Sequence, residues 1–227
     1  PHVDAGYTVK ALRTYVEASL KNTGLERLDL IQLHCPPTDT FYRPEIFRLF
    51  EDLKQEGKIA HLGVSVEKVE EGLKAMQYDN VTTVQIIFNV FRQRPAELFF
   101  REAEKNDIGI IVRVPLASGL LTGKFDQNSS FDKEDHRNFN RNGEAFDKGE
   151  TFSGIDFETG LQAVDQLKGI FPQVENLAPV ALQWILQHPE VSTIIPGASK
   201  VEHLMSNLSL YERPDLTSEE IEKMNAV

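Results

Sequence analysis

The chain has 227 residues, of which 35 are acidic and 24 basic, so its formal net charge is −11. This acidity, without a cluster of Lys and Arg, excludes a broad binding face for nucleic acid or for an anionic membrane. The single cysteine, Cys35, excludes a disulfide framework, and no long apolar run or signal-peptide pattern is present. We therefore expect a cytoplasmic protein in which residues 1–227 form one domain.

The first part of the chain alternates between helical and strand patterns. Apolar residues recur at helical spacing from Val9 to Leu20, with Thr8 as the N-cap and Gly24 as a stop signal. The elements that follow are a strand over Leu28–His34, a helix over Ile46–Leu53 closed by Gly57, a strand over His61–Val66, a helix over Val69–Met76 and a strand over Thr82–Phe88.

The same alternation continues to the end of the chain. A helix is expected from Pro95 to about Asn106, then a strand over Gly109–Leu116, helices over Leu161–Leu167 and Pro179–Gln187, a strand over Val191–Gly197, a helix over Val201–Leu208 and a last helix opened by a Thr217–Glu220 capping box. Apolar strands that alternate with helices are typical of βαβ units around a parallel sheet.

The segment Phe125–Phe157 interrupts this alternation. It is polar, rich in Asn, Asp and Gly, and contains four further phenylalanines between Phe125 and Phe157. A connection of this length inside a domain is usually a lid, a binding loop or a disordered insertion. The interspersed phenylalanines favour the lid or binding loop.

Polar or small residues stand at or near the carboxyl end of every predicted strand: His34, Ser65, Gln85 with Asn89, Arg113, and Gly197 with Ser199. In parallel α/β folds these ends face a common mouth, where ligands bind. The recurrence over five strands predicts a shared site.

Some of these residues have two interpretations when taken singly. His34 is either a local hydrogen-bonding residue or a catalyst. Arg113 lies in an apolar strand, so its charge needs a partner; that partner is either an internal carboxylate or a ligand at the mouth of the site. Cys35 fits a small buried residue better than a nucleophile, because no Cys/His/Asn set accompanies it.

Two glycine-containing segments bear on anion binding. Gly119–Phe125 lacks the spacing of a phosphate-binding P-loop, and no Rossmann fingerprint occurs. Pro196–Lys200 places small residues between a strand and a helix, which suits either an anion at the helix N-terminus or an ordinary N-cap by Ser199. The spacing of the six histidines excludes a metal site.

Five segments resemble the aldo-keto reductase family and occur in its order. They are SLKNTGLERLDLIQLHCP (Ser19–Pro36), LKQEGKIAHLGVS (Leu53–Ser65), VQIIFN (Val84–Asn89), PLASGLLTGKF (Pro115–Phe125) and the block from Ala181 through IIPGASKVEHLMSN (Ile194–Asn207). The resemblance implies an α/β fold, the (β/α)₈ TIM barrel, here represented by its last five strands and their helices. It also implies NADP(H)-dependent reduction of a small aldehyde or ketone.

The resemblance assigns roles to individual residues. His34 corresponds to the active-site histidine that hydrogen-bonds the substrate carbonyl, and Ser65 and Gln85 correspond to residues that hold the nicotinamide carboxamide. Arg113 stands where many members place an aromatic ring under the nicotinamide, and its planar guanidinium can stack there instead. The pyrophosphate segment corresponds to Leu116, Ser118, Gly119, Leu120 and Lys124, and the adenosine and 2′-phosphate site to Gly197, Ser199, Lys200, His203 and Asn207.

The sequence departs from the family pattern in three ways. Val66 replaces the usual Asn after Ser65, and His203 stands where Gln or Arg is commoner. The family's Asp, catalytic Tyr and Lys lie on strands that precede the segments matched here. Because five strands cannot close an eight-stranded barrel, we expect residues 1–227 to be a barrel domain incomplete at its amino end and inactive alone.

Two other functions remain open at this stage. One is a non-catalytic NADP(H)-binding sensor or accessory protein on the same fold, as the potassium-channel auxiliary members of the family suggest. The other is an unrelated TIM-barrel enzyme that binds phosphorylated substrates at Pro196–Lys200. The sequence does not determine the substrate or the oligomeric state.

Overall fold

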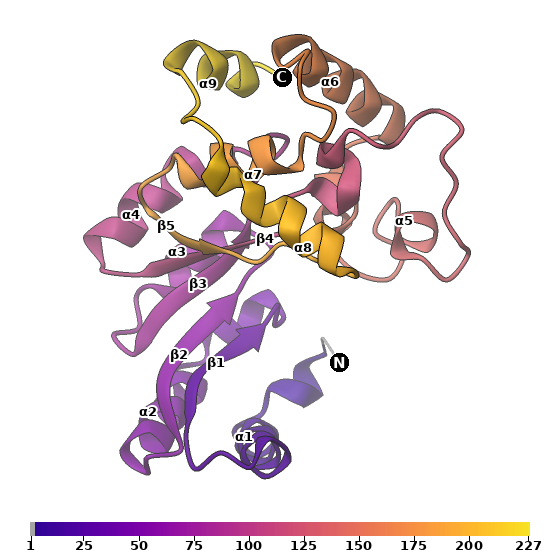
Figure 1. Cartoon of the computed structure of the whole chain (residues 1–227). Helices are drawn as coiled ribbons and strands as arrows, with labels where there is room; N and C mark the ends of the chain where they lie inside the picture. The colour runs from indigo at the N-terminus through magenta and orange to yellow at the C-terminus, as the bar shows by residue number, and fades with distance from the viewer. Residues whose placement is uncertain (1–2) are drawn as a thin grey trace. The chain divides into compact units, whose positions relative to one another are not determined.

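The computed structural model describes residues 3–227, which build a five-stranded sheet and its helices (Figure 1). The strands are β1 (Leu28–His34), β2 (Ile59–Ser65), β3 (Val81–Ile87), β4 (Gly109–Arg113) and β5 (Val191–Ile194). They are hydrogen-bonded in chain order, and β1–β2 and β2–β3 pair in parallel. By their contacts the residues divide into unit 1 (1–86 and 98–111) and unit 2 (87–97 and 112–227).

Unit 1 contains four of the α-helices: α1 (Val9–Thr23), α2 (Pro44–Gln55), α3 (Val69–Ala75) and α4 (Phe99–Lys105). The predicted N-cap is confirmed, since Thr8 accepts a hydrogen bond from the Ala11 N–H, and Gly24 ends α1 with a φ of 70°. One face of α2 is buried, with Ile46, Leu49, Phe50 and Leu53 at helical spacing. This apolar face is what fixes the helix in the unit.

Unit 2 contains the remaining helices: α5 (His136–Phe139), α6 (Phe157–Ile170), α7 (Ala178–Leu186), α8 (Val201–Leu208) and α9 (Ser218–Asn225). Trp184 on α7 is fully buried and stacks on Phe88, with the ring centroids 5.0 Å apart. Its indole N–H donates to Asn225 Oδ1 at 2.9 Å, which ties α7 to the end of α9. The capping box of Thr217 and Glu220 forms as predicted.

Three predicted boundaries are wrong. The strand expected over Gly109–Leu116 ends at Arg113, because Val114 adopts a φ of 51° and leaves the extended region. The strand expected to reach Gly197 ends at Ile194. The helix expected from Pro95 is only a short 3₁₀ turn there, and α4 begins at Phe99 because Leu98 is not helical, with a φ of −134°.

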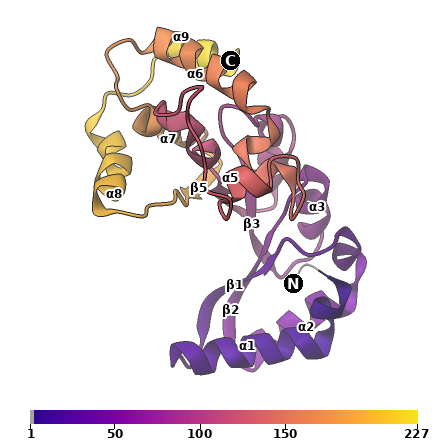
Figure 2. The same ribbon diagram turned by 90° about the vertical axis from the view of Figure 1, so that its right-hand side faces the viewer.

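The segment Phe125–Phe157 is folded on itself within unit 2, and α5 lies inside this long connection (Figure 2). The ring of Phe131 contacts those of Phe125, Phe152 and Phe157 at centroid distances of 5.2 to 5.8 Å. The Arg137 guanidinium lies 4.5 Å from the centroid of Phe131. The segment is therefore held by aromatic and cation–π contacts.

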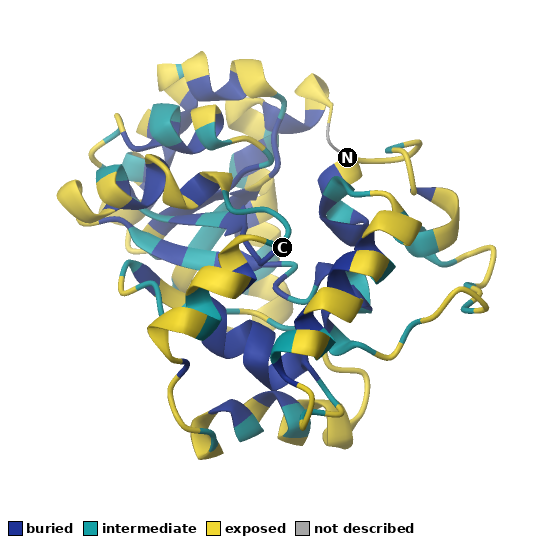
Figure 3. Cartoon of the chain, turned by 90° about the horizontal axis from the view of Figure 1, so that it is seen from above, coloured by how far each residue is buried: buried dark blue, intermediate teal, exposed yellow. Residues whose placement is uncertain are grey.

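Burial follows the pattern expected for a sheet covered by amphipathic helices. Figure 3 shows the sheet mostly in the buried and intermediate colours, and helices striped with buried and exposed residues. Within residues 3–227, no helix combines the length and apolarity needed to cross a membrane.

We predict that Gly63→Ala destabilises the protein by about 1–3 kcal/mol, as overpacking of a filled interior does. Gly63 pairs with Gln32 on one side and Thr83 on the other, and an added methyl group would overlap Thr83 Oγ1. Urea denaturation measures the change in the free energy of unfolding. Gly169→Ala is the control, because Gly169 has open space around it in α6; an equal stability for both variants would contradict this packing.

Candidate functional site

In unit 1 the carboxyl ends of three strands are joined by polar contacts. The register aligns His34 with Ser65, and Ser65 with Gln85. The Ser65 hydroxyl lies 3.4 Å from Gln85 Oε1, to which it donates, and Gln85 Nε2 donates to Gln32 Oε1 at 2.9 Å. The structure therefore brings Ser65 and Gln85 together.

Gln32 is a further member of this polar group that the sequence pattern did not single out. It lies two residues before His34 in β1, and its amide is the partner of Gln85. The available signal was a glutamine inside the apolar run Leu28–His34, since a polar side chain in a strand interior needs a hydrogen-bond partner.

The backbone around His34 is fixed although its side chain is exposed. The Tyr7 hydroxyl donates to the His34 carbonyl oxygen at 2.7 Å, and Arg43 Nη1 donates to the Tyr7 carbonyl at 3.1 Å. Burial raises the pKa of Tyr7, so its hydroxyl stays protonated and available as the donor. Cys35, which follows, is buried and has a φ of 42°.

In unit 2, Arg113 at the end of β4 is buried and forms an ion pair with Glu150. Glu150 belongs to the 3₁₀ turn Lys148–Glu150 inside the long segment. Of the two interpretations of Arg113, the internal ion pair is present in the structure. Its role toward a ligand stays a prediction.

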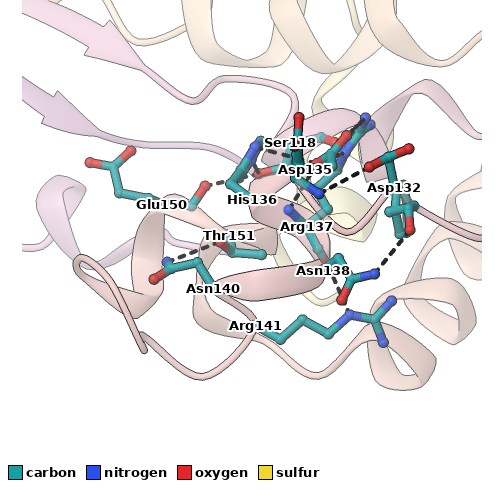
Figure 4. Close-up of polar contacts among 12 residues, drawn as sticks. Ser118, Asp132, Asp135, His136, Arg137, Asn138, Asn140, Arg141, Glu150 and Thr151 are labelled. Carbon is teal, nitrogen blue, oxygen red and sulfur yellow. Dashed lines mark hydrogen bonds and ion pairs between the residues drawn. The ribbon is translucent and has the colours of Figure 1, made fainter.

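Ser118 lies in a tight turn with a φ of 54°, and Gly119 follows with a φ of 98°. The Ser118 hydroxyl donates to the Glu150 carbonyl oxygen at 2.9 Å and accepts from the Phe152 N–H at 3.1 Å. His136 Nε2 lies 3.5 Å from Ser118 Oγ. Figure 4 shows these two side chains together. The Ser118 hydroxyl thus joins the predicted pyrophosphate segment to the turn that carries Glu150.

The other residues predicted at the pyrophosphate differ in exposure. Leu120 is buried and Leu116 is half-buried, while Lys124 is exposed. The Leu116 carbonyl accepts from the N–H groups of Gly119 and Leu121, which closes the turn. Lys124 follows Gly123, whose φ is 75°. The two leucines therefore shape the turn, and Lys124 presents a charge at the surface of unit 2.

The segment after β5 contains exposed and buried members of the predicted site. Gly197, Ser199, Lys200 and His203 are all exposed. Of the two interpretations of Pro196–Lys200, the N-cap by Ser199 is wrong: the N-cap of α8 is Lys200, which makes no side-chain cap bond, and the Ser199 hydroxyl lies 3.2 Å from His203 Nδ1. Asn207, one turn later, is 6 % exposed, and its Nδ2 has no hydrogen-bond partner.

A cavity of about 640 Å³ in unit 2 lies apart from these residues. Its walls come from the beginning of the long segment and from α6, and include Phe125, Arg141, Phe157 and Lys168. None of the predicted site residues lines it.

The model of the Aldo/keto reductase family matches residues 1–227. The chain belongs to this family. The oxidoreductase YqkF of Bacillus subtilis is 29% identical over 216 residues, covering 95% of this chain and 65% of YqkF. An L-glyceraldehyde 3-phosphate reductase of Escherichia coli O157:H7 is 26% identical, covering 97% of this chain and 64% of that protein.

A solved aldo/keto reductase structure has the same fold. The glycerol dehydrogenase of Gluconobacter oxydans superposes with a TM-score of 0.75 at 28% identity, covering 97% of this chain and 64% of that one. The chain thus spans about two thirds of the length of these relatives, and its five strands correspond to part of a TIM barrel.

The residues present fit the nicotinamide nucleotide that aldo/keto reductases use. A buried amide nitrogen without a partner costs free energy, and Asn207 Nδ2 is such a donor at one of the positions matched to the adenosine site. The amide of Gln85 and the hydroxyl of Ser65 form a hydrogen-bonding pair of the kind that binds a carboxamide. Both observations suit a ligand with heterocyclic nitrogens and an amide.

We predict that the contribution of Asp135 to stability depends on pH. Its carboxylate accepts two bonds from the Arg137 guanidinium and one from the Arg137 N–H, which lower its pKa from 3.8 to about 2. A depressed folded pKa adds stability above the unfolded pKa and loses it as the pH falls through the folded one. Asp135→Asn should therefore reduce the free energy of unfolding most above about pH 5, with the difference shrinking toward pH 2.

The exposed Asp39 supplies the control, as Asp39→Asn. Urea denaturation of the three proteins between pH 2 and pH 7 measures the effect. A constant difference between wild type and Asp135→Asn over this range would show that the ion pair with Arg137 does not stabilise the segment.

Proposed function

We propose that the protein is an NADP(H)-dependent oxidoreductase that reduces an aldehyde or ketone. Family membership supports the class of reaction. The observation that carries nucleotide binding is the buried Nδ2 of Asn207, which lacks a protein acceptor. A ring nitrogen of adenine is an acceptor of the right chemistry for it.

The proposal assigns a role to each predicted site residue within its own unit. In unit 1, Ser65 and Gln85 bind the carboxamide, and His34 hydrogen-bonds the substrate carbonyl. In unit 2, Arg113 stacks on the nicotinamide, and Leu116, Ser118, Gly119, Leu120 and Lys124 surround the pyrophosphate. Since the Ser118 hydroxyl already bonds to Glu150 and Phe152, we assign its role to shaping the turn.

The bound cofactor supplies a hydride to the carbonyl carbon, and the carbonyl oxygen takes up a proton. The chain's own contribution is to orient both reactants and to polarise the carbonyl through His34. We propose that residues 1–227 alone bind the nucleotide without completing this reaction, because the family's tyrosine acid matches none of their segments. Nucleotide binding is therefore the suitable readout for this chain.

The names of two relatives suggest a substrate class. One reduces L-glyceraldehyde 3-phosphate and the other dehydrogenates glycerol. We infer that small polar carbonyl compounds related to these alcohols and aldehydes are the substrates to test first.

We predict that Asn207→Ala weakens NADPH binding about fivefold, which corresponds to the loss of one hydrogen bond of about 1 kcal/mol. Titration of the chain with NADPH, followed by the change in nucleotide fluorescence, gives the dissociation constant. Asn22→Ala is the control, because Asn22 is exposed on α1. Unchanged affinity in Asn207→Ala, with wild-type binding intact, would remove Asn207 from the site.

We predict that Lys200→Met weakens NADPH binding about tenfold and leaves NADH binding nearly unchanged. Lys200 is exposed at the N-cap of α8, where its charge and the helix N-terminus favour the 2′-phosphate that only NADPH carries. Lys133→Met removes an exposed charge elsewhere in unit 2 and serves as the control. An equal loss for both nucleotides would contradict recognition of the 2′-phosphate.

A further inference from the structure

The carboxylate that pairs with Arg113 comes from the long segment and not from a strand of the sheet. Glu150 lies 37 residues further along the chain. The Arg113 side chain is 6% exposed and that of Glu150 is 24% exposed. A guanidinium so deeply buried is stable only with a compensating charge, which Glu150 supplies.

Glu150 is held in place by hydrogen bonds of its backbone N–H and carbonyl groups. Its N–H donates to the Asp147 carbonyl at 3.1 Å, and its carbonyl accepts from the Ser118 hydroxyl at 2.9 Å. The Asp147 side chain accepts from the Gly149 N–H at 2.8 Å, which caps the same turn. The position of this carboxylate is therefore fixed by the backbone of its own turn and by the turn at Ser118.

The segment is further anchored next to Glu150. Asn89, fully buried, donates to the Ser153 hydroxyl at 2.6 Å and to the Val114 carbonyl at 2.9 Å. Asn140 Nδ2, also fully buried, donates to Thr151 Oγ1 at 3.2 Å; Figure 4 shows Glu150, Thr151 and Asn140 side by side. These bonds hold the residues that follow Glu150. Glu150 itself pairs with Arg113, the residue that the proposed function puts under the nicotinamide.

The charge on Glu150 has a consequence for a ring stacked on Arg113. The oxidised nicotinamide ring carries a positive charge, and the reduced ring is neutral. A lone guanidinium would repel the oxidised ring only, whereas a guanidinium neutralised by a carboxylate accepts both rings. We propose that Glu150 is a specificity-determining residue that sets the relative affinity for oxidised and reduced nicotinamide nucleotide through Arg113.

This inference rests on the proposed function, because it requires the nicotinamide to lie on Arg113. Replacement of Glu150 by glutamine keeps the size of the side chain and one acceptor oxygen, and it removes the charge. The expected result is an affinity for NADP⁺ that falls about tenfold more than the affinity for NADPH, as the loss of one negative charge close to the ring produces. A role in folding alone would change both affinities by the same factor.

The experiment measures both dissociation constants by isothermal titration for wild type, Glu150→Gln and Glu134→Gln. Glu134 is an exposed carboxylate of the same segment, so its replacement makes the same change in net charge away from Arg113. The double variant Arg113→Met/Glu150→Gln removes both charges and should restore the wild-type ratio of the two affinities. Thermal melts, followed by circular dichroism, establish that each variant is folded.

The outcomes separate the inference from the proposed function. If wild type binds neither nucleotide, the proposed function fails. If wild type binds both and Glu150→Gln leaves the ratio of affinities unchanged, the proposed function stands and the role of Glu150 is refuted. If Glu150→Gln does not fold, Arg113→Met decides, because it removes the guanidinium and keeps the carboxylate: an affinity for NADP⁺ that rises relative to that for NADPH supports the inference, and an unchanged ratio overturns it.

Discussion

The buried charge of Arg113 is the constraint on which the arrangement of unit 2 depends. An unpaired guanidinium at this depth would cost about 3–5 kcal/mol, a large part of the net stability of a domain. The protein meets that cost with Glu150, and the long segment must fold back onto the end of β4 to deliver it. Asp135 with Arg137 and the phenylalanine cluster then hold the rest of the segment. One charge at a strand end thus explains why a polar segment of this length is ordered.

Unit 1 solves a comparable problem without charge. Gln85 links the three strands, since it accepts from Ser65 and donates to Gln32, while Tyr7 and Arg43 fix the backbone at His34. A site built this way is arranged before a ligand arrives, which reduces the ordering cost of binding. In unit 2, by contrast, the buried Nδ2 of Asn207 has no hydrogen-bond acceptor.

Local chemistry was readable from the sequence where it acts over a few residues. Thr8 and Gly24 bound α1 as expected, β1 covers the predicted Leu28–His34, and the Thr217 capping box opens α9. The positions of Ser65 and Gln85 at neighbouring strand ends also followed from the alternation of strands and helices.

Other features depend on contacts distant in sequence or on backbone angles that no pattern encodes. The partner of Arg113 lies 37 residues away in a polar stretch, so the sequence left ion pair and ligand as alternatives. Val114 has a positive φ, which ends β4 earlier than predicted. Because β-branched side chains restrict the backbone and side-chain conformation, nothing in the sequence indicated this angle. Ser199 does not cap α8, because its hydroxyl pairs with His203.

The most direct test of nucleotide binding uses the single tryptophan, Trp184, which is buried in unit 2. Its emission overlaps the absorption of the reduced nicotinamide ring, so bound NADPH should quench it and emit in turn. We expect saturable quenching by NADPH and none by sugar phosphates at the same concentration. Quenching by neither compound, or by sugar phosphates alone, would contradict the account.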